Sequence, residues 1–301
     1  MVLLELFSGI GGFSKGMELA GYSFDKVYFS EINEHAIANF KFNFPHAEHL
    51  GSVTEITGVD IEHPNIITFG SPCQNFSAAG DGTGLQGSQS SLIQYAIDAI
   101  QYFRPDVFIW ENVKGVLFAK HRTDFWAIIK AFGNIGGYRL EWQLLNTKWF
   151  LPQNRERIYL VGRLAKRCSG NLFPISPQGK ESSSLNDGKV PVCGTLTKSY
   201  AKQPNLAYYV VQATPAELYK AKIESIDFTK IRMLTEVECE RLQGFPDDFT
   251  RFGNYDGKIK EIARVHRYEM LGNAVSVPVV RCVTEKVKEH TDFTNNTIKK
   301  K

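Results

Sequence analysis

The chain has 301 residues, of which 43% are hydrophobic and 22% are charged, and its formal net charge is +3. That composition is ordinary for a globular protein, and the length predicts one large domain with a smaller one. No apolar run is long enough to cross a bilayer, and residues 1–6 lack the basic flank and the length of a signal peptide. We therefore expect an intracellular protein rather than a secreted or membrane protein.

Five cysteines are spread along the chain, and no two of them form a Cys-x-x-Cys pair, so no metal site is expected. An odd number of cysteines in an intracellular protein predicts free thiols, of which one is a candidate nucleophile and the others are inert small side chains. The cysteines are Cys73, Cys168, Cys193, Cys239 and Cys282.

Predicted strands and helices alternate over the first half of the chain. This alternation predicts an α/β fold, in which helices cover both faces of a mostly parallel sheet. The apolar patterns place strands at 2–6, 26–30, 66–69, 107–110, 138–145 and 158–162, and helices at 13–20, 33–42 (capped by Asn33), 92–103 and 123–135.

The pattern then changes. From 165 to about 215, Gly, Pro, Ser, Asn and Lys dominate, which predicts a small loop-rich or β-rich domain. The segment 165–230 carries nine Lys or Arg against five Asp or Glu, which indicates either a solvated surface or a surface for phosphates. Helical signals return with a capping box at Thr235 and Glu238 and a last helix at 278–288. The expected divisions are a large domain at 1–164, a small domain at 165–268, a segment at 269–290 that returns to the large domain, and a frayed tail at 291–301.

Candidate functional residues follow several predicted strands. They are the glycine-rich turn at 9–12, Glu31, Cys73 and Glu111. In open α/β sheets, ligands bind beyond the carboxyl ends of the strands. These residues are therefore expected to share one site at that edge of the sheet.

The sequence Phe-Ser-Gly-Ile-Gly-Gly at 7–12 connects the first strand to the first helix, and Glu31 ends the next strand. Glycines let the backbone approach a ligand closely, and a carboxylate at that place can bind ribose hydroxyls. The combination predicts a nucleoside cofactor, with a tight turn and a surface glutamate as the alternative.

Cys73 lies in a Ser-Pro-Cys-Gln turn at 71–74, directly after a buried strand, where it is expected to face the cleft. Nearby backbone N–H groups or arginines would raise its thiolate fraction. A lone cysteine is more often a small core residue, but its place in this turn favours a nucleophile.

Charged side chains in two further segments complete the candidate site. Glu111 in Trp-Glu-Asn-Val ends a buried strand, where a carboxyl group half removed from water can stay protonated near neutral pH. Arg155 and Arg157 alternate, so that in a strand both point to one face and suit a phosphate or a developing negative charge. The alternatives are a helix-capping glutamate and an edge-strand charge pair.

In their order along the chain, these segments resemble the motifs of the C5-cytosine-specific DNA methyltransferases. The resemblance runs from about residue 3 to 280 and includes Arg-Met-Leu-Thr at 232–235, Gln-Gly-Phe-Pro at 243–246 and Gly-Asn-Ala-Val at 272–275. It implies a Rossmann-like S-adenosyl-L-methionine-dependent catalytic domain and a small target-recognition domain at 165–268. It also implies a bacterial or phage enzyme of the restriction-modification type, cytoplasmic, nucleoid-associated and monomeric. Its implied partner is double-stranded DNA, with a separately acting cognate endonuclease as a further candidate and no membrane partner.

The resemblance implies that the target cytosine is flipped out of the duplex. Cys73 would attack C6 of that base, while Glu111 would hold N3 and the exocyclic amine and donate a proton to N3. Arg157 would contact the base, with Arg155 as its companion. Electron density pushed to C5 would take the methyl group from the sulfonium, a base would remove the C5 proton, and Cys73 would leave.

The resemblance also assigns contacts to the cofactor and to DNA. Glu31 matches the ribose ligand, and Ile32 matches the residue that packs on adenine. The matched cofactor positions are Phe7, Ser8, Gly9, Ile10, Gly12, Glu31, Ile32, Ser52, Val53, Pro72, Leu92, Asn273, Ala274 and Val275. The positions matched to DNA are Gln74, Ser77, Thr195 and Leu196, the last two within Gly-Thr-Leu-Thr at 194–197.

Two positions depart from the family's pattern. Ser52 stands where members often have an aspartate for the adenine amino group, and Gln89-Ser90 stands near the place of an Arg-Gly pair. That adenine contact and the DNA contacts of the loop after Cys73 are therefore left open.

Three alternatives differ from a DNA methyltransferase. A transfer RNA cytosine-5 methyltransferase would share the catalytic motifs but would carry a Cys-Phe-Thr element, which the sequence lacks. A catalytically silent DNA-binding protein would not need Cys73, Glu111 and Arg157 together. A nicotinamide dehydrogenase would need the G-x-G-x-x-G pyrophosphate fingerprint, which the glycines at 9, 11, 12 and 16 do not match.

Overall fold

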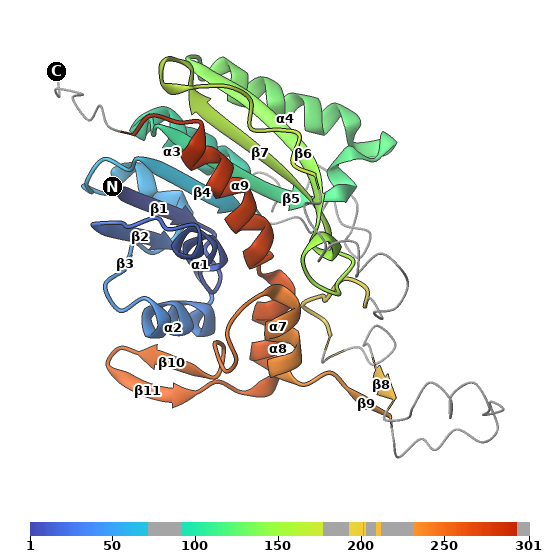
Figure 1. Ribbon diagram of the computed structural model, residues 1–301. Helices are drawn as coiled ribbons and strands as arrows, with labels where there is room; N and C mark the ends of the chain where they lie inside the picture. The colour runs from blue at the N-terminus through green and yellow to red at the C-terminus, as the bar shows by residue number, and fades with distance from the viewer. Residues whose placement is uncertain (72–91, 177–192, 201, 203–208, 212–230, 294–301) are drawn as a thin grey trace.

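The computed structural model describes residues 1–71, 92–176, 193–200, 202, 209–211 and 231–293. At the centre of these residues lies a seven-stranded sheet with the order β3-β2-β1-β4-β5-β7-β6 (Figure 1). The first five strands in that order run parallel, and β7 is antiparallel to both β5 and β6, which confirms the predicted mostly parallel sheet. The strands are β1 (Val2–Leu6), β2 (Lys26–Ser30), β3 (Glu48–His49), β4 (Ile66–Gly70), β5 (Val107–Val113), β6 (Tyr138–Asn146) and β7 (Glu156–Leu164).

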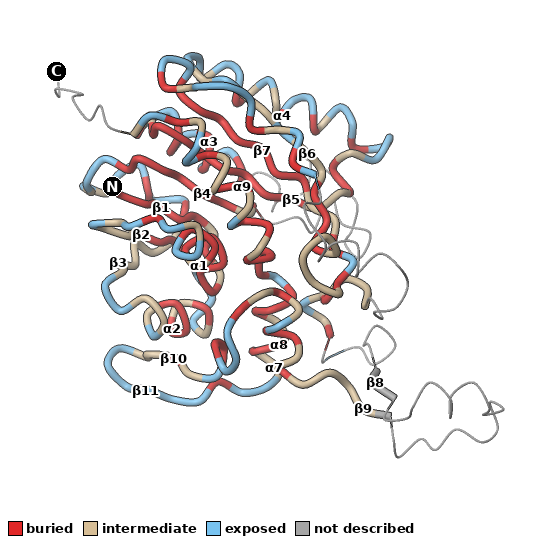
Figure 2. Tube along the Cα trace, viewed as in Figure 1, coloured by how far each residue is buried: buried red, intermediate tan, exposed pale blue. Residues whose placement is uncertain are grey.

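Helices cover both faces of the sheet, as the sequence predicts. Side chains alternate along each strand, so Leu4 and Leu6 pack toward α3 and α4, while Leu3 packs toward α1 and α9. Figure 2 shows the resulting arrangement, with buried strands between helices whose outer surfaces are exposed. The helices are α1 (Gly12–Leu19), α3 (Leu92–Phe103), α4 (Arg122–Asn134) and α9 (Val277–Glu289).

The last helix of the described chain, α9, packs closely on the first, α1. A Cβ atom on Gly16 would lie 2.5 Å from a methyl group of Val280, so only glycine permits this approach. The Tyr22 hydroxyl also donates to the Thr284 carbonyl at 2.9 Å. The C-terminal part of the chain therefore completes the covering of the N-terminal strands.

A third hydrophobic cluster lies below the carboxyl end of the sheet and joins α2 to the elements after residue 231. Asn33 caps α2 by accepting from His35 N at 3.1 Å, as expected, and the capping box of Thr235 and Glu238 is confirmed. On α2, Asn39 donates to the Phe249 and Phe252 carbonyls, which holds the hairpin of β10 and β11 in place. The elements are α2 (Glu34–Asn43), α7 (Glu236–Gln243), β10 (Phe252–Tyr255), β11 (Lys258–Glu261) and α8 (Arg264–Asn273).

The change of composition at residue 165 follows the last strand of the central sheet, but it does not mark the end of packing on that sheet. Residues 165–175 continue along β6 and the end of α9. Gln143 on β6 both donates to and accepts from the backbone of Ile175, at 2.7 Å each, and Ser169 N donates to the His290 carbonyl at 3.0 Å. At the other end, the Phe293 ring packs edge-on against Tyr22, so the polar tail is anchored through residue 293.

Much of the predicted target-recognition domain lies outside the described residues. Within it, the short strands β8 (Tyr209–Val211) and β9 (Ile231–Met233) pair antiparallel. Four cysteines in the described chain are free thiols, namely Cys168, Cys193, Cys239 and Cys282. The described residues contain no group of three or more His, Cys, Asp or Glu placed to hold a metal ion. Nor does any helix among them have the length and apolar character needed to cross a membrane.

Glu5 is a fully buried carboxyl group on β1, beneath the glycine-rich turn. The backbone N–H and the hydroxyl of Ser14 donate to one of its oxygens at 3.1 and 2.5 Å. Burial nevertheless raises the pKa of Glu5 from 4.5 to about 7. Because the pKa is higher in the folded state, ionisation of Glu5 opposes folding as the pH rises from about 4.5 through 7.

We predict that this group lowers the free energy of unfolding by on the order of 3 kcal/mol between about pH 4.5 and pH 8. Glu5→Gln cannot ionise, so urea denaturation at several pH values should show a smaller loss for this variant. Glu18→Gln, which removes an exposed carboxylate from α1, is the control and should keep the wild-type pH dependence. Equal pH dependence in wild type and Glu5→Gln would contradict the assignment.

Candidate active site

A cavity of about 1040 Å³ opens at the carboxyl ends of the parallel strands. It brings together residues that are far apart in the sequence, which is what the common position at strand ends predicts. Ile10 does not line it and is buried in the third hydrophobic cluster instead. The expected site residues that line the cavity are Phe7, Ser8, Gly9, Gly12, Glu31, Ile32, Ser52, Val53, Leu92, Glu111, Arg155, Arg157, Thr195, Leu196, Asn273, Ala274 and Val275.

The expected nucleophile segment begins beside Glu111. Pro72, Cys73, Gln74 and Ser77 lie outside the described residues, so their roles stay predictions. The described chain leads directly to them, because Gly70 is the register partner of Glu111 between β4 and β5. The next residue, Ser71, accepts hydrogen bonds from the Trp110 ring at 3.0 Å and from the Asn112 amide at 3.3 Å.

Glu111 is a buried carboxyl group, 6% exposed, near the end of β5. Its Oε1 atom lies 3.1 Å from Nε of Arg157, on the neighbouring strand β7. Burial raises the pKa of Glu111, while the positive charges of Arg157 and Arg155 act in the opposite direction. The carboxyl group can therefore hold its proton at a higher pH than an exposed glutamate, as a proton donor at neutral pH must.

Arg155 makes different contacts from its companion Arg157. It is 2% exposed, and its guanidinium donates to the carbonyls of Leu196 at 3.0 Å, Gly272 at 3.2 Å and Ala274 at 2.8 Å. Three backbone segments are thereby joined at one side chain. The alternation of the two arginines predicted a shared face but could not predict these partners.

Two buried glutamines continue this network. Gln153 accepts from Leu196 N at 3.0 Å and donates to the Leu242 carbonyl at 2.7 Å, and Gln243 donates to the Leu271 carbonyl at 2.8 Å. The segment at Leu196 is therefore fixed to the wall of the cavity. The motif at 243–246 contains Gln243, but the sequence predicted no role for either glutamine, because no spacing indicates which carbonyls a buried amide will meet.

The glycine-rich turn and Glu31 form the opposite part of the cavity. Glu31 accepts from Gly9 N at 2.9 Å and, through its other oxygen, from Ile32 N at 2.8 Å and Asn33 N at 2.9 Å. Gly9 has φ +54°, and no atom lies within 4 Å of the place where a Cβ would stand. The turn therefore presents open backbone to the cavity beside a fixed carboxylate.

Ile32 and Ser52 line the same cavity as Glu31. Ile32 is 78% exposed, which is unusual for an isoleucine of a folded protein and leaves an apolar surface beside Glu31. Ser52 caps the 3-10 helix η1 (Val53–Gly58) by accepting from Thr54 N at 3.3 Å. Its hydroxyl therefore has a local role in the chain.

A comparison with models of protein families identifies the family of this chain. The model of the family described as C-5 cytosine-specific DNA methylase matches residues 1–192 and 178–289. The chain belongs to this family.

Three relatives align with this methylase over nearly their whole length. The Type II methyltransferase M.Bsp6I of Bacillus sp. (strain RFL6) is 28% identical, over 95% of this chain and 98% of the relative. M.NlaX of Neisseria lactamica is 29% identical over 95% and 96%. M.HaeII of Haemophilus aegyptius is 30% identical over 93% and 90%.

Solved structures support the fold of the methylase. The Dnmt2 methyltransferase of S. pombe superposes with a TM-score of 0.67 at 20% identity, over 96% of this chain and 98% of that one. A putative DNA modification methyltransferase encoded within an E. coli prophage superposes with a TM-score of 0.61 at 20% identity, over 96% and 99%. At this identity the likeness concerns the fold alone.

The methylase has one backbone contact that a single methyl group would test. A Cβ on Gly272 would lie 2.2 Å from the carbonyl carbon of Thr197 and 2.3 Å from Lys198 N. We predict that Gly272→Ala displaces the segment at Leu196 and lowers the free energy of unfolding by about 1–3 kcal/mol. Gly133→Ala on α4, where a Cβ meets open space, is the matched control and should be as stable as wild type or more so. Equal thermal stability of the Gly272→Ala variant and wild type would show that the segment yields without cost.

Proposed function

We propose that this protein is a sequence-specific DNA (cytosine-5)-methyltransferase that uses S-adenosyl-L-methionine and acts on a cytosine flipped out of the duplex. The buried pair of Glu111 and Arg157 carries the proposal, because it offers a proton donor and a cation at the place where the chain enters the Cys73 turn. Membership of the family and the names of its Type II relatives support the same function.

The residues around the glycine-rich turn fit the cofactor. Glu31 keeps lone pairs for ribose hydroxyls while three backbone N–H groups fix its orientation, and the exposed side chain of Ile32 offers an apolar surface for adenine. Asn273 and Val275 line the same cavity from the C-terminal side. When bound, S-adenosyl-L-methionine supplies a methyl group activated by its sulfonium centre.

The chemistry of the base is assigned to two groups. The thiolate of Cys73 forms a bond to C6, while Glu111 donates a proton to N3, so that the ring carries no net charge. Addition at C6 moves the double bond to C4–C5, and this electron pair would form the bond from C5 to the methyl group as the bond between that methyl group and the sulfonium sulfur breaks. A base removes the C5 proton, the C5–C6 double bond reforms as the Cys73 sulfur leaves as thiolate, and N3 returns its proton to Glu111.

Arg157 and Arg155 have different roles in this proposal. Arg157 holds Glu111 in place and offers its remaining N–H groups to the base, since its guanidinium lies beside the carboxyl group. Arg155 holds the segments of Leu196 and Ala274 at the cavity wall through backbone carbonyls. It is therefore a positioning residue, while Arg157 touches the reacting base.

We predict that cells expressing the wild-type protein acquire 5-methylcytosine at a fixed short sequence, which bisulfite sequencing of their DNA would identify. Cys73→Ser should abolish this methylation, because a hydroxyl is a far weaker nucleophile than a thiolate. Cys282→Ser, which changes a thiol of α9 that does not line the cavity, is the control and should methylate normally. Binding of S-adenosyl-L-methionine to purified Cys73→Ser should survive in calorimetry.

A duplex with 5-fluorocytosine at the identified site should form a denaturation-resistant adduct with wild type but not with Cys73→Ser, since fluorine does not leave as the C5 proton does. Unmethylated DNA in wild-type cells, together with methyl transfer to transfer RNA in vitro, would overturn the proposal in favour of an RNA substrate.

Lysine substitutions should separate the two arginines. Arg157→Lys loses the planar fork beside Glu111, so we predict a fall in kcat of about 10²-fold or more with a small change in KM. Arg155→Lys satisfies fewer carbonyls, so we predict a higher KM for both DNA and cofactor with a smaller change in kcat. Steady-state kinetics measure both, and a pure kcat loss in Arg155→Lys would contradict its positioning role.

A further inference from the structure

The chain after β5 forms one edge of the active-site cavity. Lys114, Gly115 and Phe118 of this segment line the cavity, and Thr195 and Lys198 line it from another part of the chain. We call residues 114–122 the β5–α4 lip. It consists of two 3-10 helices, η3 (Lys114–Leu117) and η4 (Ala119–His121), and the first residue of α4.

The lip is held rigidly from inside. Val116 is fully buried in the cluster beneath α3 and α4, and His121 is 2% exposed. Phe118 N donates to the Gly115 carbonyl at 3.1 Å, and His121 N donates to the Phe118 carbonyl at 2.8 Å. Because these anchors point inward, the side chains of Phe118, Lys120 and Arg122 remain exposed on a fixed backbone.

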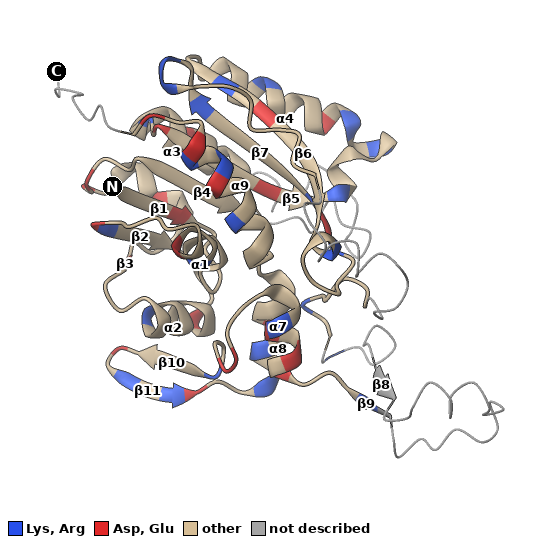
Figure 3. Ribbon diagram, in the orientation of Figure 1, with Lys and Arg blue, Asp and Glu red and all other residues tan. Residues whose placement is uncertain are grey.

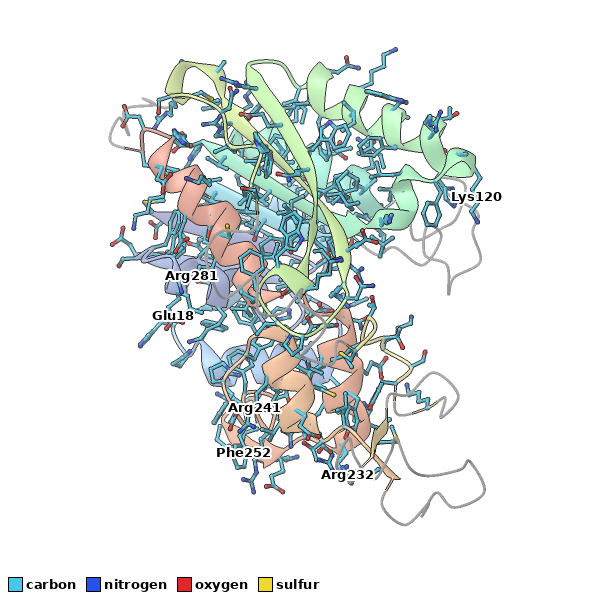
Figure 4. All side chains as sticks on the ribbon, turned by 45° about the vertical axis from the view of Figure 1, so that its right-hand side comes forward. Glu18, Lys120, Arg232, Arg241, Phe252 and Arg281 are labelled. Carbon is cyan, nitrogen blue, oxygen red and sulfur yellow. The ribbon has the colours of Figure 1, made fainter. Side chains whose placement is uncertain are left out.

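The outward side chains of the lip carry unbalanced positive charge. Lys114 is paired with Glu156 at 2.8 Å, but over the described part of the chain Lys120 and Arg122 have no ion pair. Asp124, on the next turn, lies 3.6 Å from a ring nitrogen of His121. Figure 4 shows Lys120 projecting outward from the end of the molecule where α4 begins.

Several other exposed cations of the described chain are paired with carboxylates. Arg241 contacts Asp247, and Arg251 contacts Glu261, at 2.5 and 2.8 Å. Lys120 and Arg122 have no such partner in that part of the chain, and they differ from the likewise unpaired Lys258 and Lys260 of β11 by their place, two and four residues beyond Phe118 at the cavity edge.

We propose that Lys120 and Arg122 bind backbone phosphates of the duplex beside the extruded base. This rests on the proposed function, because a base that enters the cavity brings its flanking phosphates to the cavity edge. Duplex DNA offers a dense row of negative charge, and a lip that is already rigid loses little conformational freedom on binding. The contact would use residues of the predicted large domain, and phosphate contacts read no base sequence.

The test is the salt dependence of binding to a fluorescent duplex oligonucleotide of mixed sequence. Each phosphate contact contributes about 0.9 to the slope of log K against log salt, so Lys120→Gln/Arg122→Gln should reduce the magnitude of the slope by about 1.8. Lys120→Gln alone should reduce it by about half as much. On unmethylated DNA that contains the site methylated by wild type, the double variant should have a higher KM for DNA and the same kcat, since neither residue lines the cavity.

The matched control is Lys258→Gln/Lys260→Gln, which removes two exposed charges from β11. Figure 3 shows β11 at the opposite end of the molecule from the beginning of α4, so this control should keep the wild-type slope. The proposal would be overturned if the lip double variant kept the wild-type slope, or if both double variants lost the same amount of slope. It would also be overturned if the slope decreased for binding to RNA but not for binding to duplex DNA. If the lip double variant shows the expected change of slope but wild type methylates no DNA, the proposed function is wrong and the phosphate-binding role of the lip is still supported.

Discussion

The buried contact between Glu111 and Arg157 is the interaction on which the site depends. Removing an isolated charge from water costs several kcal/mol, so the carboxyl group in the 6% exposed position needs either a proton or a cation. The site offers both, because burial raises the pKa of Glu111 while Arg157 lies 3.1 Å away. A group balanced between these two states can give up a proton to a bound ring and recover it afterwards.

This arrangement requires a well-ordered cavity wall, and a second network of buried polar side chains holds that wall in place. Gln153, Arg155 and Gln243 bind only backbone carbonyls or amides in the contacts described above, and they join strand β7 to the segment at Leu196 and to the ends of α7 and α8. Satisfied buried polar groups fix one arrangement of the chain, since any shift would leave donors without acceptors. The same network places the segments at Leu196 and Ala274 around one cavity.

Two regions of the site offer different chemical groups to a ligand. The glycine-rich turn and Glu31 present backbone and one carboxylate to the cavity, whereas the β5–α4 lip carries positive charge beyond its outer edge. The proposed function assigns the cofactor to the first region and the duplex to the second.

The sequence by itself determined the alternating strands and helices, the cap at Asn33 and the positions of Glu31 and Glu111 at strand ends, because these follow from local periodicity and capping chemistry. It also predicted which residues share the cavity, since parallel strands end at one edge. Ile10 was misplaced, the hairpin of β10 and β11 and helix α8 were not predicted, and residues 165–175 proved to follow the sheet. Only the tertiary structure decided that Arg155 binds three carbonyls and that Lys120 has no carboxylate partner among the described residues. These properties depend on groups tens to hundreds of residues away, whose distances no local pattern contains.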